Sequence, residues 1–190
     1  MERSDHLMRV IRTNYILSFD ASAQSETTWD ELVTLLSGAT PEHLDNEGDP
    51  VVNALLFLIS DPANPNSMRS LISKARENAR GVQDNITKEV WEEVNQLYHI
   101  VIDPTLPDKI QGSGAMEIID KLDQSSLLFY GVTDSTMPRG QGWNFMSLGK
   151  FIERTTLTID TIHYHFKNIE NPMHSTQDIL FWKNLLLSLS

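Results

Sequence analysis

Apolar residues follow a helical spacing along nearly the whole chain. Between Phe145 and Ile169, apolar or small residues recur at alternating steps of three and four, which places them on one side of a long helix. That side consists of Phe145, Leu148, Ile152, Thr155, Ile159, Ile162, Phe166 and Ile169. We expect it to face the core. A second stripe of this kind runs from Met68 to Val82, and no strand-like alternation of useful length accompanies it. The pattern therefore predicts an all-α protein.

Capping residues, prolines and glycines mark where these helices begin and end. Thr28 and Glu31 form a capping-box pattern, and Thr87 precedes a helix that is expected to end at Asp103 and Pro104. Three further helix starts are predicted by a capping residue ahead of a proline, at Thr40-Pro41, Asp49-Pro50 and Asn64-Pro65. The segment from Asp108 to Tyr130 reads as one more helix, weakened near its start by Gly112 and Gly114. We expect a single-domain bundle of seven or eight helices.

Composition narrows the class of protein further. A chain of 190 residues is near the usual size of one domain, and its formal net charge of -11 argues against general binding to nucleic acid. The absence of cysteine excludes disulfides, cysteine-ligated zinc and thiol catalysis. The longest apolar stretch, Val51–Ile59, is too short to cross a bilayer, and the first residues do not form a signal peptide. We therefore expect a soluble, cytoplasmic protein that does not bind membranes.

The chain contains an internal repeat of two helices. A shift of 151 residues lays Glu153 and Arg154 on Glu2 and Arg3, and it also aligns apolar positions further along both helices. The first helical pattern begins at Met1 without a cap, and the last stops at Ser190 with an apolar face. This suggests a piece of a longer protein. The alternative is a homodimer in which a second copy covers that last face, which consists of Leu185, Leu186, Leu187 and Leu189.

The repeated Glu-Arg pair lies away from the apolar stripe of its helix. We therefore place it in a second layer, with the hypothesis that Glu2 binds Arg154 and Glu153 binds Arg3, because an arginine fork suits a carboxylate. A purely structural network is favoured over a ligand site, since buried ion pairs are common without any chemistry.

Two other groups could receive an anion. Arg69, Arg76 and Arg80 stand on one side of a helix beside Glu77, although pairing with surface carboxylates explains them more simply. The turn from Asp134 to Trp143 leads into a helix start, where backbone N-H groups and Arg139 could bind an anion. Asp160 and His163 have the spacing of metal-binding bundles, but no second motif accompanies them, so we expect neither metal nor cofactor. The common nucleotide, serine-hydrolase and zinc-protease motifs are also missing.

Several motifs together resemble those of a known family. IERTTLTIDTI preceded by GWNFMSLGKF, with ARENARGVQD and VTDSTMPRGQGW, resembles the Alpha-E superfamily, bacterial all-helical proteins of unknown function with an internal Glu-Arg motif. The resemblance covers essentially the whole chain. It implies one domain over residues 1–190 that lacks the family's N-terminal helix start and C-terminal third. The sequence departs from the usual pattern at Lys150, where arginine is common, and at Thr155 and Thr156, which replace Ala-Asp or Ala-Glu.

The resemblance also implies a functional setting. Genes for such proteins commonly neighbour, or are fused to, an ATP-grasp ligase and a transglutaminase-like peptidase. We therefore expect a non-catalytic accessory protein that binds the ligase, the transglutaminase-like protein or a small acidic peptide. The alternatives are an enzyme of the same pathway, with Glu153 or Asp134 as general acid or base and arginines holding a carboxylate, and a purely structural bundle. The candidate ligand-binding residues are Glu2, Arg3, Arg76, Glu77, Arg80, Asp134, Arg139, Glu153 and Arg154.

Overall fold

The structure, a computed structural model, describes residues 1–19, 28–38, 48–167 and 176–189. Within these ranges the chain forms nine α-helices and a short 3-10 turn at Gln83–Asn85, with no strand, which confirms the all-α class. The helices are α1 (Glu2–Leu17), α2 (Trp29–Ser37), α3 (Pro50–Ile59), α4 (Met68–Gly81), α5 (Lys88–Val101), α6 (Leu106–Gln111), α7 (Ala115–Thr136), α8 (Gln141–Lys167) and α9 (Thr176–Leu189). No helix in the described part is both long and apolar enough to cross a membrane.

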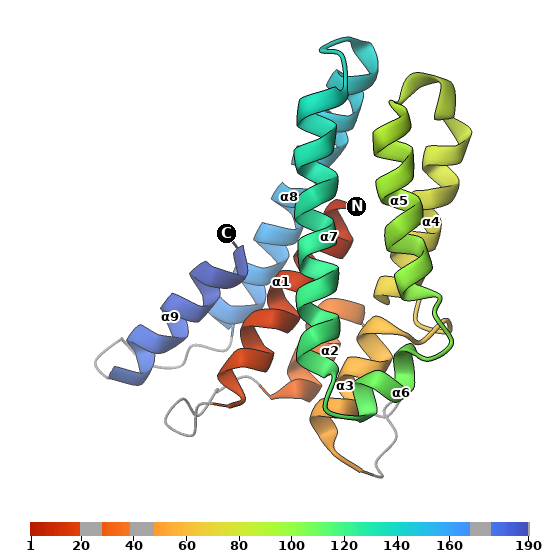
Figure 1. Ribbon diagram of the computed structural model, residues 1–190. Coiled ribbons are helices and arrows are strands. Elements are labelled where there is room, and N and C mark those ends of the chain that lie inside the picture. Colours follow the sequence, from red (N-terminus) through yellow and green to blue (C-terminus); the bar gives the residue numbers. More distant parts are fainter. Residues whose placement is uncertain (20–27, 39–47, 168–175, 190) are drawn as a thin grey trace.

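Helix α1 lies at the centre of the bundle. It packs against α4, α7, α8 and α9, while α5 packs between α4 and α7. Figure 1 shows the α4–α5 and α7–α8 hairpins standing side by side, with α2, α3 and α6 gathered at one end and α9 on the outside. The first helix of the chain is therefore in contact with one of its last, which is the arrangement that the repeated Glu-Arg pair requires.

The hydrophobic core is built by helices α1 to α7, with α2 contributing Val33. Its most deeply buried side chains are Met8, Ile11, Leu55, Leu58, Ile59, Met68, Ile72, Leu97, Leu106, Ile110, Ile119 and Leu122. These largest buried side chains come from α1, α3, α4, α5, α6 and α7, and α8 supplies none of them. The long helix that carries the second Glu-Arg pair is thus a peripheral element.

The expectation that the apolar stripe of α8 faces the core is wrong. Phe145, Leu148, Ile152, Ile159 and Phe166 are each more than half exposed, and Ile162 and Thr155 are exposed as well. Helix α8 turns its other side toward α1, with Thr161 buried and the Glu-Arg pair partly buried. A regular spacing shows that a helix has an apolar side, but it does not show what covers that side. Ile169 lies outside the described residues.

Most predicted helix starts are confirmed in detail. The Thr28 hydroxyl accepts from the backbone N-H of Glu31, and the Glu31 carboxylate accepts from the backbone N-H of Thr28. Asp49 caps α3 with Pro50 in its first turn, and Thr87 caps α5. These signals act over three or four residues, so they do not depend on tertiary packing.

Two boundaries differ from the sequence prediction. Ser67 caps α4, whereas the Asn64 side chain accepts from the backbone N-H of Asn66 in the preceding turn. The segment from Asp108 to Tyr130 is not one helix, because α6 ends at Gln111 and α7 begins at Ala115. A side chain in place of Gly114 would put its Cβ 3.0 Å from the carbonyl oxygen of Lys109, so this sharp turn favours glycine. Thr40 and Pro41 lie outside the described residues.

Candidate functional site

The two Glu-Arg pairs bind each other reciprocally. Helices α1 and α8 lie side by side and run in the same direction, so that the repeated residues meet. Nε of Arg154 is 2.5 Å from a carboxylate oxygen of Glu2, and Nε of Arg3 is 2.6 Å from a carboxylate oxygen of Glu153. The pairing hypothesis is confirmed on both counts. We refer to Glu2–Arg154 as the inner pair and to Arg3–Glu153 as the outer pair.

The two pairs differ in their exposure to water. The Glu2 side chain is 4% exposed and its Arg154 partner 37% exposed, whereas Arg3 and Glu153 are 51% and 30% exposed. Glu2 also accepts a hydrogen bond of 2.6 Å from the Tyr130 hydroxyl of α7. The inner pair therefore ties α1 to both α7 and α8, while the outer pair lies near the surface.

The inner pair keeps its charges despite its burial. Burial alone would raise the pKa of Glu2, but hydrogen bonds from Arg154 and Tyr130 more than offset it, and the net shift of the Glu2 pKa is downward. The hydrogen bond to Glu2 raises the pKa of Arg154. Burial and donation to Glu2 raise the pKa of Tyr130, so the phenol stays neutral. The result is a fixed carboxylate held by one cation and one neutral donor.

Further polar groups of α1 extend this network inward. Arg9 donates to Asp5 at 2.7 Å, one helical turn away, and burial raises the pKa of Asp5 in spite of that cation. His6 is buried beside Thr161 of α8, with 3.3 Å between its Nε2 and the hydroxyl oxygen. Burial, with a further contribution from Arg9, lowers the pKa of His6 to about 4, so this imidazole is neutral at pH 7. Sequence reasoning missed Asp5, His6 and Tyr130, because no spacing signal joins them to α8.

A cleft opens beside the two pairs. Its volume is about 560 Å³, within the range of small-molecule sites, and it lies between the start of α1 and helices α4, α7 and α8. Its apolar and aromatic wall includes Leu71, Phe129, Tyr130, Trp143, Phe145, Met146 and Phe151. Its charged lining residues are Glu2, Arg3, Lys74, Asp134, Lys150 and Glu153. We call this space the α1–α8 cleft.

In the α1–α8 cleft the negatively charged side chains have counter-ions among the described residues and the lysines do not. Each of its three carboxylates already has a cation: Glu2 has Arg154, Glu153 has Arg3, and Asp134 has Arg139 at 3.4 Å.

The lysines of the cleft, by contrast, lack such a counter-ion. Nζ of Lys150 lies 4.3 Å from the ring centre of Tyr130 and makes no ion pair with any residue that the structure describes. Nζ of Lys74 donates to the backbone carbonyl of Pro65. The unmatched charge in the cleft is therefore positive. Lys150 and Lys74 were not among the candidate residues drawn from the sequence, although Lys150 stands out there as a departure from the family pattern.

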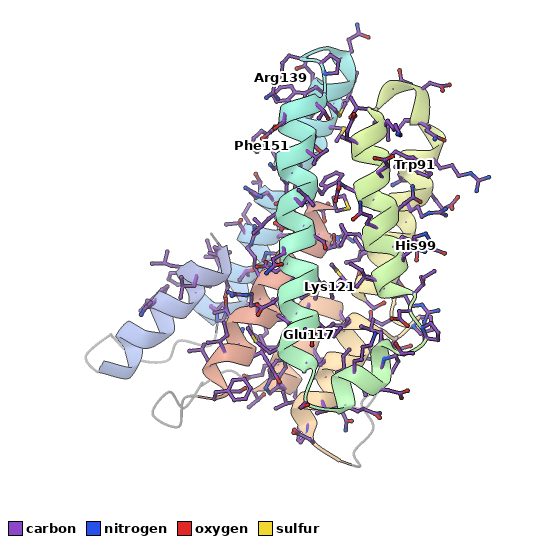
Figure 2. The ribbon with its side chains drawn as sticks, viewed as in Figure 1. Trp91, His99, Glu117, Lys121, Arg139 and Phe151 are labelled. Carbon is purple, nitrogen blue, oxygen red and sulfur yellow. The ribbon has the colours of Figure 1, made fainter. Side chains whose placement is uncertain are left out.

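Other candidates lie elsewhere. Arg76 stacks over Tyr98 of α5 at 4.5 Å and donates to Asn95, while Arg80 pairs with Glu77 at 3.6 Å. Arg76 also lies 5.7 Å from the ring centre of Trp91, which Figure 2 shows on α5. None of Arg76, Glu77 and Arg80 lines the cleft.

Arg139 lies at the tip of the α7–α8 hairpin, where it covers the ring of Trp143 (Figure 2). The structure thus brings together Glu2, Arg3, Glu153 and Arg154, and it places Asp134 in the cleft wall with its partner Arg139 outside the lining. It leaves Arg76, Glu77 and Arg80 apart from them. Within the described residues, no group of three or more histidine or acidic side chains is placed to hold a metal ion.

A family comparison agrees with this geometry. The Alpha-E model, described as "a predicted alpha-helical domain with a conserved ER motif", matches residues 1–190. Comparisons with curated proteins and with solved structures gave no match. The helical bundle and the two Glu-Arg pairs between α1 and α8 fit that description, and the match spans the whole chain. The chain therefore belongs to the Alpha-E family.

Proposed function

We propose that this protein is a non-catalytic accessory protein that binds the acidic end of a small peptide in the α1–α8 cleft. The observation that carries the proposal is Lys150, a cation in an aromatic-lined cleft with no carboxylate partner among the described residues. A carboxylate of the ligand would supply the missing partner, because charge-assisted hydrogen bonds to ammonium groups are among the stronger polar contacts.

The apolar wall of the cleft and Lys74 suit the part of such a peptide next to its carboxylate. Trp143, Phe129 and Phe151 offer apolar surface for a side chain next to the carboxylate. Lys74, on the facing side of α4, supplies a second ammonium group near the same space. An apolar wall combined with a few convergent polar groups is the usual composition of a small-molecule site.

The reciprocal pairs then have a structural part in this function. Arg3 and Glu153 hold α1 against α8 at the edge of the cleft, and the inner pair does the same at greater depth. A general acid or base must be free to reach the proton that it transfers. Glu153 and Asp134, the two residues considered for that role, are each engaged by an arginine. This supports binding rather than catalysis.

The partner proposed for this site follows from the family resemblance. An ATP-grasp ligase or a transglutaminase-like peptidase makes or cleaves amide bonds in small peptides, and either would produce or consume a ligand with a free carboxylate. We therefore propose that the protein presents such a peptide to one of these enzymes. The peptide class and the enzyme partner are separate parts of the proposal and are tested separately.

The peptide part is tested by calorimetric titration with an acetylated tripeptide that has apolar residues and a free C-terminal carboxylate. We expect saturable binding that weakens by about tenfold or more for the C-terminal amide and for Lys150→Gln, since each removes a charge-assisted contact. Lys121→Gln is the matched control, because Lys121 is an exposed lysine of α7 outside the cleft (Figure 2). Equal binding of acid and amide would contradict the peptide proposal.

The partner part is tested with the tagged protein as bait in cells that contain the ligase and the transglutaminase-like protein, followed by mass spectrometry. Recovery of either enzyme by the wild-type protein supports the assignment. Recovery of neither enzyme, in an experiment in which the peptide still binds, would remove the partner and leave the binding site. Hydrolysis or ligation of the tripeptide by the purified protein would instead favour the enzyme alternative.

A further inference from the structure

The exposed side of α8 has the repeat of a coiled-coil seam. Residues 145, 148, 152, 155, 159, 162 and 166 alternate in steps of three and four, so they occupy both inward positions of three successive heptads and the first inward position of a fourth. Six of the seven are Phe, Leu or Ile, and the seventh is Thr155 near the middle. All seven are exposed. We call these seven residues the α8 seam.

The positions that flank the seam in the same heptads are also exposed or partly exposed to solvent. On one flank lie Gly149, Thr156 and His163, and on the other lie Asn144, Phe151, Thr158 and His165. Five of these residues are exposed, and Thr158 and His165 are partly exposed. The residues that hold α8 to the bundle, among them Arg154, Leu157 and Thr161, belong to the remaining heptad positions. Helix α8 therefore uses one side to pack on the bundle and leaves the other side largely exposed, although the ring centre of Phe166 lies 5.2 Å from the ring centre of Trp182 in α9.

The exposed apolar area is large enough for a stable interface. The seam runs for roughly 30 Å along the helix. Its apolar members and Phe151 are between 37% and 72% exposed. With about 200 Å² for a fully exposed side chain, they present on the order of 700–800 Å². That area matches the roughly 800 Å² that each partner contributes to a standard protein interface. It also exceeds the apolar patch of a typical monomer, about 300–600 Å².

The charge pattern selects the kind of partner. The whole chain carries a formal net charge of -11, which would normally oppose the approach of a second copy. None of the fourteen seam and flanking residues is Asp, Glu, Lys or Arg. In coiled coils, charges at the flanking positions choose between partners and repel wrong ones. Their absence leaves the seam free to meet an identical seam without like-charge repulsion.

We propose that two copies of this chain pair through their α8 seams to form a two-fold symmetric homodimer. Such an interface is self-complementary, because the same apolar side chains of each copy pack against those of the other. Phe145 of the seam, with Gly149 and Phe151 of its flanks, also lines the α1–α8 cleft, so the dimer interface would share these residues with the edge of that cleft. The dimer does not require a bound peptide, because it rests on the exposed apolar side of α8 and not on Lys150.

The oligomeric state of the full chain tests this directly by sedimentation equilibrium over a range of concentrations. We expect a dimer for the wild type and at least about 100-fold weaker association for Ile159→Glu, which places two charges in the buried seam. Leu127→Glu on α7 is the matched control, because Leu127 is an exposed aliphatic residue of the same size as Ile159 but lies outside the seam. Far-UV circular dichroism checks that each variant keeps its helices.

Cysteine cross-linking locates the contact between the two copies in a dimer that stays intact. The chain has no cysteine, so a single Thr155→Cys provides one thiol in the middle of the seam. Mild oxidation should cross-link Thr155→Cys efficiently in either helix direction, and Leu127→Cys should remain largely uncross-linked. A wild type that is monomeric at all concentrations would overturn the proposal. So would a dimer that Leu127→Glu dissociates while Ile159→Glu leaves it intact.

Discussion

The inner ion pair should contribute more to stability than the outer pair, because only the inner pair has a buried member. Replacing Arg154 with methionine leaves Glu2 buried, at 4% exposure, with only the Tyr130 hydroxyl as a hydrogen-bond donor. Breaking a fully buried ion pair costs about 3–5 kcal/mol. Because Arg154 is itself 37% exposed, water can screen part of this, and we expect a loss of about 2 kcal/mol at pH 7.

Arg3→Met is the matched comparison. It removes the same kind of contact, an arginine Nε at 2.6 Å from a carboxylate, at the repeat-equivalent position of α1. Both members of this outer pair are substantially exposed, and exposed pairs contribute about 0–1 kcal/mol. The two substitutions are alike in sequence terms, so a difference in their effect on the free energy of unfolding would come from burial.

The pH dependence of the Arg154→Met effect gives a second criterion. In the wild type the pKa of Glu2 lies below its usual 4.5, so its contribution to stability is present above that pH and is lost as the pH falls through the folded-state pKa. In Arg154→Met, burial is no longer offset, and the pKa of Glu2 should rise above its usual value. Protonation of Glu2 then removes the uncompensated buried charge from the variant. The difference in free energy of unfolding between wild type and Arg154→Met should therefore shrink as the pH falls from about 8 to about 5.

Urea denaturation followed by tryptophan fluorescence measures these free energies, and a double-mutant cycle with Glu2→Gln isolates the coupling of the pair. We expect the double variant to be less destabilised than the sum of the two single variants. The reasoning is refuted if Arg154→Met costs no more than Arg3→Met. A cost that stays constant with pH would refute the assignment of the effect to a buried, charged Glu2.

Three further predictions test other parts of the structure. Because burial lowers the pKa of His6 to about 4, this residue should cost the wild type up to about 1.4 kcal/mol of stability per pH unit as the pH falls from 6.5 to about 4. His6→Asn should flatten this slope in denaturation curves, and NMR titration checks the His6 pKa. Thr28→Ala, which removes the capping box of α2, should lower the free energy of unfolding by about 1 kcal/mol, whereas Thr34→Ala within the same helix should change it by less than about 0.5 kcal/mol. Leu97→Ala in the core of α5 should cost about 2–5 kcal/mol and Leu127→Ala on the exposed side of α7 less than about 0.5 kcal/mol, and similar costs would contradict the assigned helix faces.

Much of the secondary structure could be predicted from the sequence because its signals are local. The capping box at Thr28 and Glu31 and the caps at Asp49 and Thr87 act within one helical turn. The break between α6 and α7 is sharper than the sequence predicts, since Gly112 and Gly114 alone indicate only a weakened helix. Only the close approach of position 114 to the Lys109 carbonyl shows why the chain turns there.

The candidate site was predictable in part. The repeat placed Glu2 and Arg3 on Glu153 and Arg154, and reciprocal pairing followed from the match between a guanidinium and a carboxylate. The sequence could not show that Tyr130 completes the inner pair, or that Lys150 lies in the cleft without a carboxylate partner among the described residues. These residues come from α7 and α8, and their meeting with α1 depends on how the helices pack.

The sequence by itself determined that this chain is helical, where many of its helices begin, and that two of them carry equivalent Glu-Arg pairs. Only the tertiary structure decided which side of α8 the bundle covers and which of the two pairs is buried. A periodic apolar pattern is a property of one helix, whereas burial is a relation between helices. The packing of α8 on α1 through polar residues therefore leaves its most regular apolar stripe facing outward.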